Sequence, residues 1–243
     1  ALGLPEVSAV ARRSSGVREQ AAGSLAWLER DARHLLCHDD PRYPALLAEL
    51  DDAPPLLFVA GEPALLERPQ LAMVGSRQAS RPGLDTAARF ARSLAGGGFV
   101  VTSGLALGID GAAHVGALEA GGSTVAVLGT GPDVPYPREH AGLLARIATH
   151  GAVVSEHPPG TTARREHFPS RNRILAGLSL GTLVSEAAAR SGALITARLA
   201  ADAGREVFAV PGSIHNPMAR GCHRLIRDGA ALVETADEVI SAL

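Results

Sequence analysis

Short apolar runs alternate with longer segments rich in Ala and Arg through most of this chain. None of the runs shows the apolar–polar alternation of a strand with one solvated face, so they predict strands covered on both faces. The segments between them, several of which end in Gly, predict helices. Interleaved strands and helices favour a doubly wound α/β fold with a mostly parallel sheet. The runs predicted as strands span residues 56–59, 71–74, 99–102, 124–128, 152–154, 182–184, 207–210 and 231–233.

The start of the chain has a different pattern. Between residues 17 and 36 apolar residues, including Leu25, Trp27 and Leu28, recur at near-helical spacing. A stretch rich in Pro and Asp follows, and it predicts a linker into the first strand. We therefore expect a short helical segment with a linker over residues 1–34 and an α/β domain over residues 35–243.

Composition narrows the class of protein. The 243 residues are 46% hydrophobic and 20% charged, with a net charge of -2, which suits a globular protein with a large core. No apolar run reaches the roughly 18 residues of a membrane helix, so no membrane partner is expected. The first residues contain no secretory signal and no initiator Met, which predicts a fragment. Cys37 and Cys222 are the only cysteines, which favours a reducing, cytoplasmic location.

The basic residues are all of one type, because the chain contains no Lys and its 23 basic residues are Arg. A GC-rich genome is sufficient to explain this bias. Arg nevertheless presents a planar fork that binds phosphate or carboxylate with two hydrogen bonds. Local clusters of Arg therefore matter more here than the small net charge.

Ligands of doubly wound sheets bind beyond the carboxyl ends of the strands. After residues 71–74 come Gly75, Ser76 and Arg77, a tight turn that can form an anion site with the following helix. By itself this triplet is also typical of an ordinary turn with a solvated Arg.

The loop after residues 99–102 is a second candidate. It contains Ser103, Gly104 and Gly108, and these glycines permit close approach of a ligand to the backbone. Asp110 is placed to cap the next helix or to accept a bond from a loop N–H. The loop matches neither a Walker A motif nor a G-x-G-x-x-G motif.

The segment after residues 152–154 concentrates positive charge. Within ten residues it holds Arg164, Arg165, Arg171 and Arg173, and Phe168 lies among them. His167 and Asn172 belong to the same segment. A solvated helix start would explain the cluster, but its position beyond a strand end favours phosphate contacts with a base stacked on the aromatic ring.

A further donor-rich helix start follows residues 182–184, where Arg190, Ser191 and Gly192 occur together. The four loops together predict a phosphate-binding pocket without an evident nucleophile, metal or general base. This pattern favours binding over turnover.

Catalytic and metal sites find little support. His114 lies a turn into the helix after Ser103, but no G-x-S-x-G elbow frames that serine. His215, Cys222 and His223 fit no standard zinc spacing. Glu156 and Glu186 follow their strands at the same offset, and we expect them to be structural or to accept hydrogen bonds from Arg.

Several motifs, in order, resemble the DNA-processing protein A family, also called DprA or Smf. They include SGLALGID, FPSRNRI and SGALIT, and the resemblance extends over residues 43–233. It implies an extended Rossmann-like domain that binds single-stranded DNA, protects incoming strands in natural transformation and loads the RecA recombinase onto them, without enzymatic activity and with no cofactor. It also implies a homodimer that forms around Leu225 and Ile226. The DNA-binding residues implied by this match or by the loops above are Gly75, Ser76, Arg77, Ser103, Gly104, Gly108, Phe168, Arg171, Asn172, Arg173, Arg190, Ser191 and Gly192.

Two departures from that family and two alternatives remain. His223 stands where the family pattern has Asn, and the terminal domains that many members carry are not evident in this sequence. The alternative function is a nucleotide-processing enzyme similar to the phosphoribohydrolases, whose P-G-G-x-G-T-x-x-E motif is not matched here. A dinucleotide-binding dehydrogenase would need a G-x-G-x-x-G motif and an acidic residue for the ribose.

Overall fold

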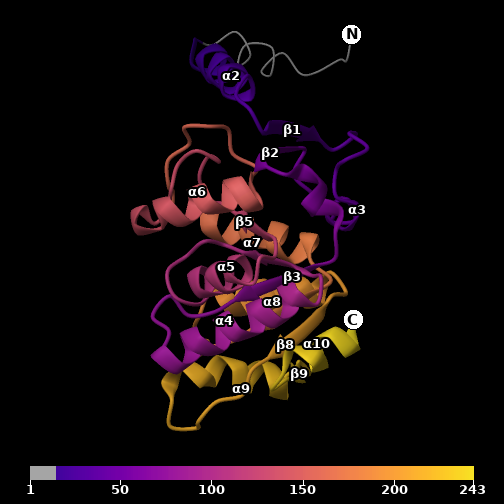
Figure 1. The fold of residues 1–243 in the computed structure, drawn as a ribbon, viewed down its shortest axis with the longest axis vertical. Helices are drawn as coiled ribbons and strands as arrows, with labels where there is room; N and C mark the ends of the chain where they lie inside the picture. Colours follow the sequence, from indigo (N-terminus) through magenta and orange to yellow (C-terminus); the bar gives the residue numbers. More distant parts are fainter. Residues whose placement is uncertain (1–14) are drawn as a thin grey trace.

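The computed structural model describes residues 15–243, and its strands form one mixed sheet in the order β1-β2-β6-β5-β4-β3-β7-β8-β9 (Figure 1). The strands are β1 Arg33–Cys37, β2 Leu56–Gly61, β3 Gln70–Val74, β4 Val100–Ser103, β5 Thr124–Val127, β6 Ala152–Ser155, β7 Gly181–Val184, β8 Glu206–Ala209 and β9 Ala231–Leu232. From β6 to β9 along the sheet all neighbours are parallel, whereas β2 pairs antiparallel with β1 and with β6. This confirms the predicted doubly wound, mostly parallel α/β sheet, and the eight predicted runs correspond to β2–β9.

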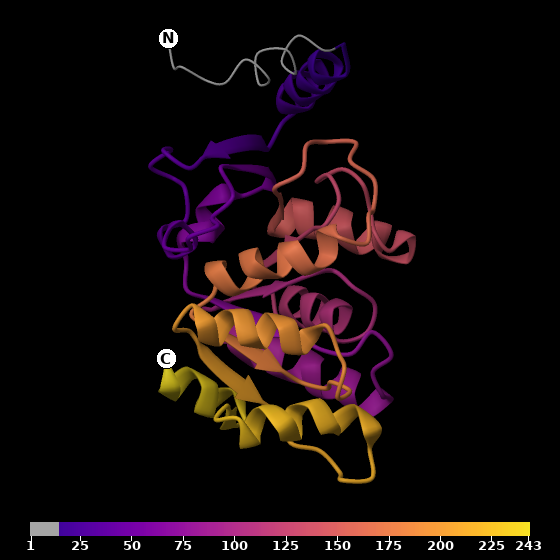
Figure 2. The same cartoon turned by 180° about the vertical axis from the view of Figure 1, so that it is seen from behind.

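Helices cover both faces of the sheet. They are α2 Ser15–Leu28, α3 Ala45–Ala48, α4 Arg81–Gly96, α5 Ile109–Glu119, α6 Ala141–His150, α7 His167–Leu178, α8 Ala193–Asp202, α9 Arg220–Arg227 and α10 Ala236–Ala242. The helices α4, α5, α6 and α10 pack on one face, while α7, α8 and α9 pack on the other (Figures 1 and 2). Within β3, Met73 faces the first group and Val74 the second, and both are buried. Burial of both strand faces explains the continuous apolar runs.

The chain changes direction across the sheet at β3. After β3 it builds β4, β5 and β6 on one side, and it then returns to place β7 on the other side of β3. The loops that follow β3 and β7 therefore leave the sheet towards opposite faces, and a crevice opens between them. This topological switch point fixes the position of the candidate site.

The N-terminal prediction was wrong in one respect. The helix ends at Leu28, and Arg33–Cys37 forms β1, which pairs antiparallel with β2. Leu36 is fully buried in the core. Burial of this apolar side chain stabilises the segment as an edge strand, in preference to a further turn of helix. The predicted boundary between residues 34 and 35 falls inside β1, and α3 occupies the predicted linker.

The helix that precedes β1 is fixed to the sheet by an aromatic contact. Trp27 is buried, and its ring lies 6.0 Å from that of Phe58 of β2 in an edge-to-face arrangement. The predicted helical segment over residues 1–34 is thus helical over Ser15–Leu28, and residues 1–14 lie outside the described part. Within residues 15–243, no helix combines the length and the apolar character needed to cross a bilayer.

Candidate nucleic-acid interface

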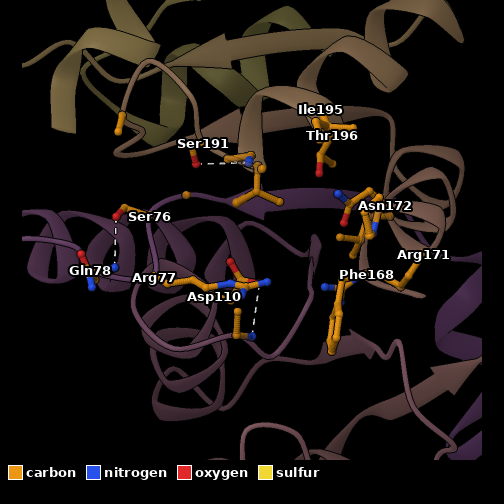
Figure 3. Close-up of a pocket in the computed structure, with 18 of the residues that line it drawn as sticks. Ser76, Arg77, Gln78, Asp110, Phe168, Arg171, Asn172, Ser191, Ile195 and Thr196 are labelled. Carbon is orange, nitrogen blue, oxygen red and sulfur yellow. Dashed lines mark hydrogen bonds between the residues drawn. The ribbon is translucent and has the colours of Figure 1, made fainter. Parts of the chain in front are cut away.

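A cleft of about 530 Å³ opens at the switch point, beyond the carboxyl ends of β3 and β7 (Figure 3). We call it the strand-end cleft. Its walls come from the loop after β3, the start of α5, the first turns of α7 and the start of α8. The residues that line it are Val74, Gly75, Ser76, Arg77, Gln78, Ala106, Asp110, Phe168, Pro169, Arg171, Asn172, Leu175, Ala188, Ser191, Gly192, Ala193, Ile195, Thr196 and Met218.

The loop after β3 presents Arg77 to the cleft. The Ser76 amide donates to the Glu186 carbonyl at 2.6 Å, and the Ser76 hydroxyl accepts from the Gln78 amide at 3.1 Å. A side chain on Gly75 would collide with Ile109 and with the Glu186 carbonyl, so this position requires glycine. The turn is therefore rigid, and it holds the exposed Arg77 side chain at the mouth of the cleft.

The loop after β4 is built around the buried Asp110. Its carboxylate accepts hydrogen bonds from the backbone amides of Gly104 and Ala106, which confirms the predicted bonds from loop N–H groups. The Ser103 hydroxyl is fully buried and donates to the Met73 carbonyl at 2.6 Å. Gly108 has a φ of 78° and packs against the backbone of residues 76 and 77. Ser103, Gly104 and Gly108 thus shape the loop from within and do not line the cleft, so their DNA contacts stay a prediction.

Arg171 is buried under this loop. Its guanidinium donates to the Gly104 carbonyl at 2.9 Å and to the Val127 carbonyl. Burial lowers the pKa of Arg171 to about 10, and the charge of Asp110 opposes that shift. The residue lines the cleft, but its side chain already holds the ends of β4 and β5 together. A phosphate contact by Arg171 therefore stays a prediction, and a structural role is evident.

Arg173 and Arg171 do not form a common patch. Arg173 lies outside the cleft lining and makes a two-pronged pair with Glu156, at 3.0 and 2.7 Å, and it also contacts Asp52 at 3.2 Å. This confirms the expectation that Glu156 accepts from an Arg. Glu186 has other partners, since its carboxylate accepts from the amide and hydroxyl of Ser80 and from the Asn216 side chain.

Arg77 lies over one ring of an aromatic pair at the mouth of the cleft. The rings of Phe168 and Tyr136 lie 5.0 Å apart, and the guanidinium carbon of Arg77 lies 5.8 Å from the Phe168 ring centroid. The Tyr136 side chain is 44% exposed. Sequence reasoning placed Phe168 correctly in the cleft. Tyr136 lies beside Phe168 but outside the cleft lining, and it was missed because it belongs to a stiff, Pro-rich loop. Arg77, Phe168 and Tyr136 are called the mouth platform below.

The start of α8 supplies the wall opposite Arg77. Ser191 and Gly192 line the cleft, as does Asn172 of α7, whereas Arg190 is exposed and lies outside the lining. Gln78, Ile195, Thr196 and Met218 also line the cleft, and sequence reasoning missed Gln78, Ile195 and Met218. Met218 could not be recognised as a site residue from the sequence, because it lies 142 residues beyond Ser76, in the short 3-10 helix Pro217–Ala219.

The pair of Ser103 and His114 does not form a catalytic arrangement. His114 is fully buried, and its Nδ1 lies 2.7 Å from the Thr124 hydroxyl, while Ser103 donates to a backbone carbonyl. Thr124 in turn donates to the Val101 carbonyl, so Nδ1–H is the donor towards Thr124. The serine and the histidine are thus each engaged with other groups.

Buried His114 makes the fold sensitive to acid. Burial lowers its pKa to about 3, and the charges of His140 and Arg171 act in the same direction. The unfolded chain takes up this proton near pH 6.5, so the stabilisation is complete above pH 6.5 and is lost as the pH falls towards 3. We expect the free energy of unfolding to fall by up to about 1.4 kcal/mol per pH unit in this range from His114 alone.

Urea denaturation at several pH values between 7 and 5 measures this effect. The variant His114→Gln keeps an N–H donor for Thr124 but has no titrating group, so its stability should fall less steeply with acid than that of the parent. If the free energy of unfolding fell equally steeply with pH in parent and variant, buried His114 would not be the source of the acid sensitivity.

The residues predicted at a dimer interface lie away from the cleft. Leu225 and Ile226 of α9 are half-buried, and both pack against the core under α8. Leu225 lines a groove of about 830 Å³ between α8 and α9. Their role in a dimer stays a prediction.

Comparisons with known proteins agree on one family. The sequence model of the family described as DNA recombination-mediator protein A matches residues 34–243. Protein Smf of Escherichia coli is 48% identical over 227 residues, which are 93% of this chain and 61% of that protein. DNA processing protein DprA of Streptococcus pneumoniae is 47% identical over 202 residues, 83% of this chain and 71% of that protein. The chain thus spans less than two thirds of the length of the Escherichia coli relative.

Two of the matching solved structures are of proteins named DNA processing protein A. The X-ray structure of DNA processing protein A from Streptococcus pneumoniae has a TM-score of 0.84 at 44% identity, over 90% of this chain and 77% of that one. DNA processing protein A from Helicobacter pylori has a TM-score of 0.77 at 27% identity, over 86% of this chain and 94% of that one. The structure of the Helicobacter pylori protein is described for its mode of binding single-stranded DNA.

Proposed function

This chain belongs to the DNA recombination-mediator protein A family, and on that premise we propose that it binds single-stranded DNA in the strand-end cleft. The observation that carries the proposal is the mouth platform, in which an exposed Arg lies over one of two adjacent aromatic rings at the switch point of the sheet. Arg contacts phosphate, and an aromatic ring stacks on any base. A relative described as binding single-stranded DNA supports the choice of ligand.

The mode of binding follows from these groups. Arg77 holds a phosphate at the mouth, Phe168 stacks on a base, and the donors of Asn172 and Ser191 reach the strand from the opposite wall. No pattern of donors and acceptors specific for one base is required for this contact. Binding should therefore depend little on sequence and fall steeply with salt.

Removal of the Phe168 ring tests the stacking contact. We expect Phe168→Ala to weaken binding of an oligo-dT strand roughly 5- to 160-fold, because stacking contributes about 1–3 kcal/mol per base. Fluorescence anisotropy with a labelled strand measures the loss. Phe168→Tyr keeps the ring and should bind within about twofold of the parent. A Tyr variant as weak as the Ala variant would contradict stacking.

We propose further that the bound strand is passed to the RecA recombinase and is protected meanwhile, as in natural transformation. Membership of a family described as recombination mediators supports this step. The measurement is the amount of RecA on a labelled strand with and without the chain, and an equal amount in both cases would contradict the proposal.

We also propose that two chains associate through α9, around Leu225 and Ile226, and that the protein acts in the cytoplasm. The half-buried apolar pair beside the groove between α8 and α9 supports association at this face. Sedimentation equilibrium should give the mass of two chains.

We propose, finally, that the chain binds the DNA strand without catalysing a reaction on it. The support for this proposal is that Ser103, His114 and Glu186 are each hydrogen-bonded to structural partners. Release of free base from a nucleoside monophosphate would contradict it and favour the phosphoribohydrolase alternative.

A further inference from the structure

A second cavity, larger in volume, lies next to the strand-end cleft. It has a volume of about 930 Å³ and runs between α4, α5 and α6, on the face of the sheet turned to the viewer in Figure 1. We call it the α4–α6 groove. Its floor contains the small residues Ala88, Gly111 and Ala112, and its walls carry Arg89 of α4 and Arg146 of α6.

The groove and the cleft meet at one residue. Arg77 lines both cavities, so its guanidinium is available to a ligand that passes from one to the other. The turn that holds Arg77 is rigid, because Gly108 at the edge of the groove packs against the backbone of residues 76 and 77. A ligand longer than the cleft that leaves past Arg77 therefore enters the α4–α6 groove.

Charge along the groove is mostly positive. Among the described residues that line the groove, one acid–base pair is formed: Arg92 and Glu119 lie 2.8 Å apart, so their two charges balance. Arg89 and Arg146 are exposed, and neither forms an ion pair with another residue of the described part of the chain. Together with Arg77 they give three unbalanced Arg side chains against one exposed carboxylate, that of Asp85.

The wall formed by His140 is also fixed. Its Nδ1 lies 2.9 Å from the Leu105 carbonyl, and its ring covers Gly111 so closely that a side chain at position 111 would collide with it. The groove is thus a formed surface with small residues below and basic residues on two sides. An extended polyanion, whose charges repeat along its length, fits such a surface.

We propose that the α4–α6 groove carries the continuation of the DNA single strand that leaves the strand-end cleft past Arg77, and that Arg89 and Arg146 contact its phosphates. This inference rests on the proposed binding of single-stranded DNA. It adds a path for the strand and two phosphate contacts outside the cleft. The contacts are made only by strands long enough to fill both cavities.

Strand length separates the two cavities in an experiment. The double variant Arg89→Ala/Arg146→Ala should bind an oligo-dT of about 5 nucleotides within about twofold of the parent, because the cleft is unchanged. It should bind an oligo-dT of about 20 nucleotides roughly tenfold more weakly. Because the double variant no longer neutralises two of the phosphates, the slope of log K against log salt for the long strand should become shallower by about 1.4.

Arg68→Ala is the matched control. Arg68 is also exposed, but it lies just before the amino end of β3, whereas the cleft lies beyond the carboxyl ends of the strands. Arg68→Ala should therefore change the affinity for neither the short nor the long DNA strand. Equal binding of the long strand by parent and double variant would overturn the groove proposal, and so would an equal loss for both strand lengths. Failure of the parent itself to bind either strand would instead contradict the proposed function.

Discussion

Replacement of Arg77 by Ala should weaken binding of a DNA single strand about 10- to 100-fold, while the free energy of unfolding stays within about 0.5 kcal/mol of the parent. Arg77 is exposed, so its removal leaves no buried group without a partner. It lines the cleft and the groove and lies over Phe168, so one substitution removes a contact that both cavities share.

Salt dependence distinguishes the loss of a phosphate contact from a general loss of affinity. For Arg77→Ala we expect the slope of log K against log salt to become shallower by about 0.7, the value for one phosphate on a single strand. Arg77→Lys keeps the charge but not the planar fork of the guanidinium, so its affinity for the DNA strand should lie between those of the parent and the Ala variant. Binding by Arg77→Ala as tight as that of the parent would show that the strand lies elsewhere.

Replacement of Arg171 by Ala should lower the free energy of unfolding by about 3–5 kcal/mol. The substitution would leave the Gly104 and Val127 carbonyls without their donor and the buried Asp110 carboxylate without its neighbouring positive charge. Burial raises the pKa of Asp110, whereas the charge of Arg171 lowers it, so the two groups stabilise each other's charged form.

Urea denaturation measures the effect, with the midpoint and the slope both recorded. Arg165→Ala is the matched control, because Arg165 belongs to the same Arg-rich segment but is exposed. It should change stability by less than about 0.5 kcal/mol. An Arg171→Ala variant that unfolds like the parent and yet loses strand binding would instead identify Arg171 as a direct DNA contact.

The positions of Arg171 and Arg173 show what the sequence could not provide. The two residues looked like one patch because they are two positions apart, but successive helix residues turn by about 100° and these side chains leave α7 on nearly opposite sides. Arg171 donates hydrogen bonds to backbone carbonyls at the ends of β4 and β5, whereas Arg173 forms ion pairs with Glu156 and Asp52. Proximity in the sequence therefore predicted a charge cluster that the helix divides.

The parts that were predictable depend on burial and on chain order. The apolar run of β3 predicted a strand covered on both faces, and the rule for strand ends predicted that Arg77 and Ser191 would meet at one cleft. The strand β1 was missed because a pair of apolar residues, Leu35 and Leu36, fits a helix as well as an edge strand. Its pairing with β2 was decided by contacts distant in the chain.

Titration of the unmodified protein with a labelled oligo-dT strand and with its duplex form, at two salt concentrations, tests the central claim most directly. Fluorescence anisotropy should give tighter binding to the single strand than to the duplex, because stacking on Phe168 requires an unpaired base. Higher salt should weaken that binding. Binding of the duplex as tightly as the single strand, or affinity for the single strand that does not change with salt, would contradict the account.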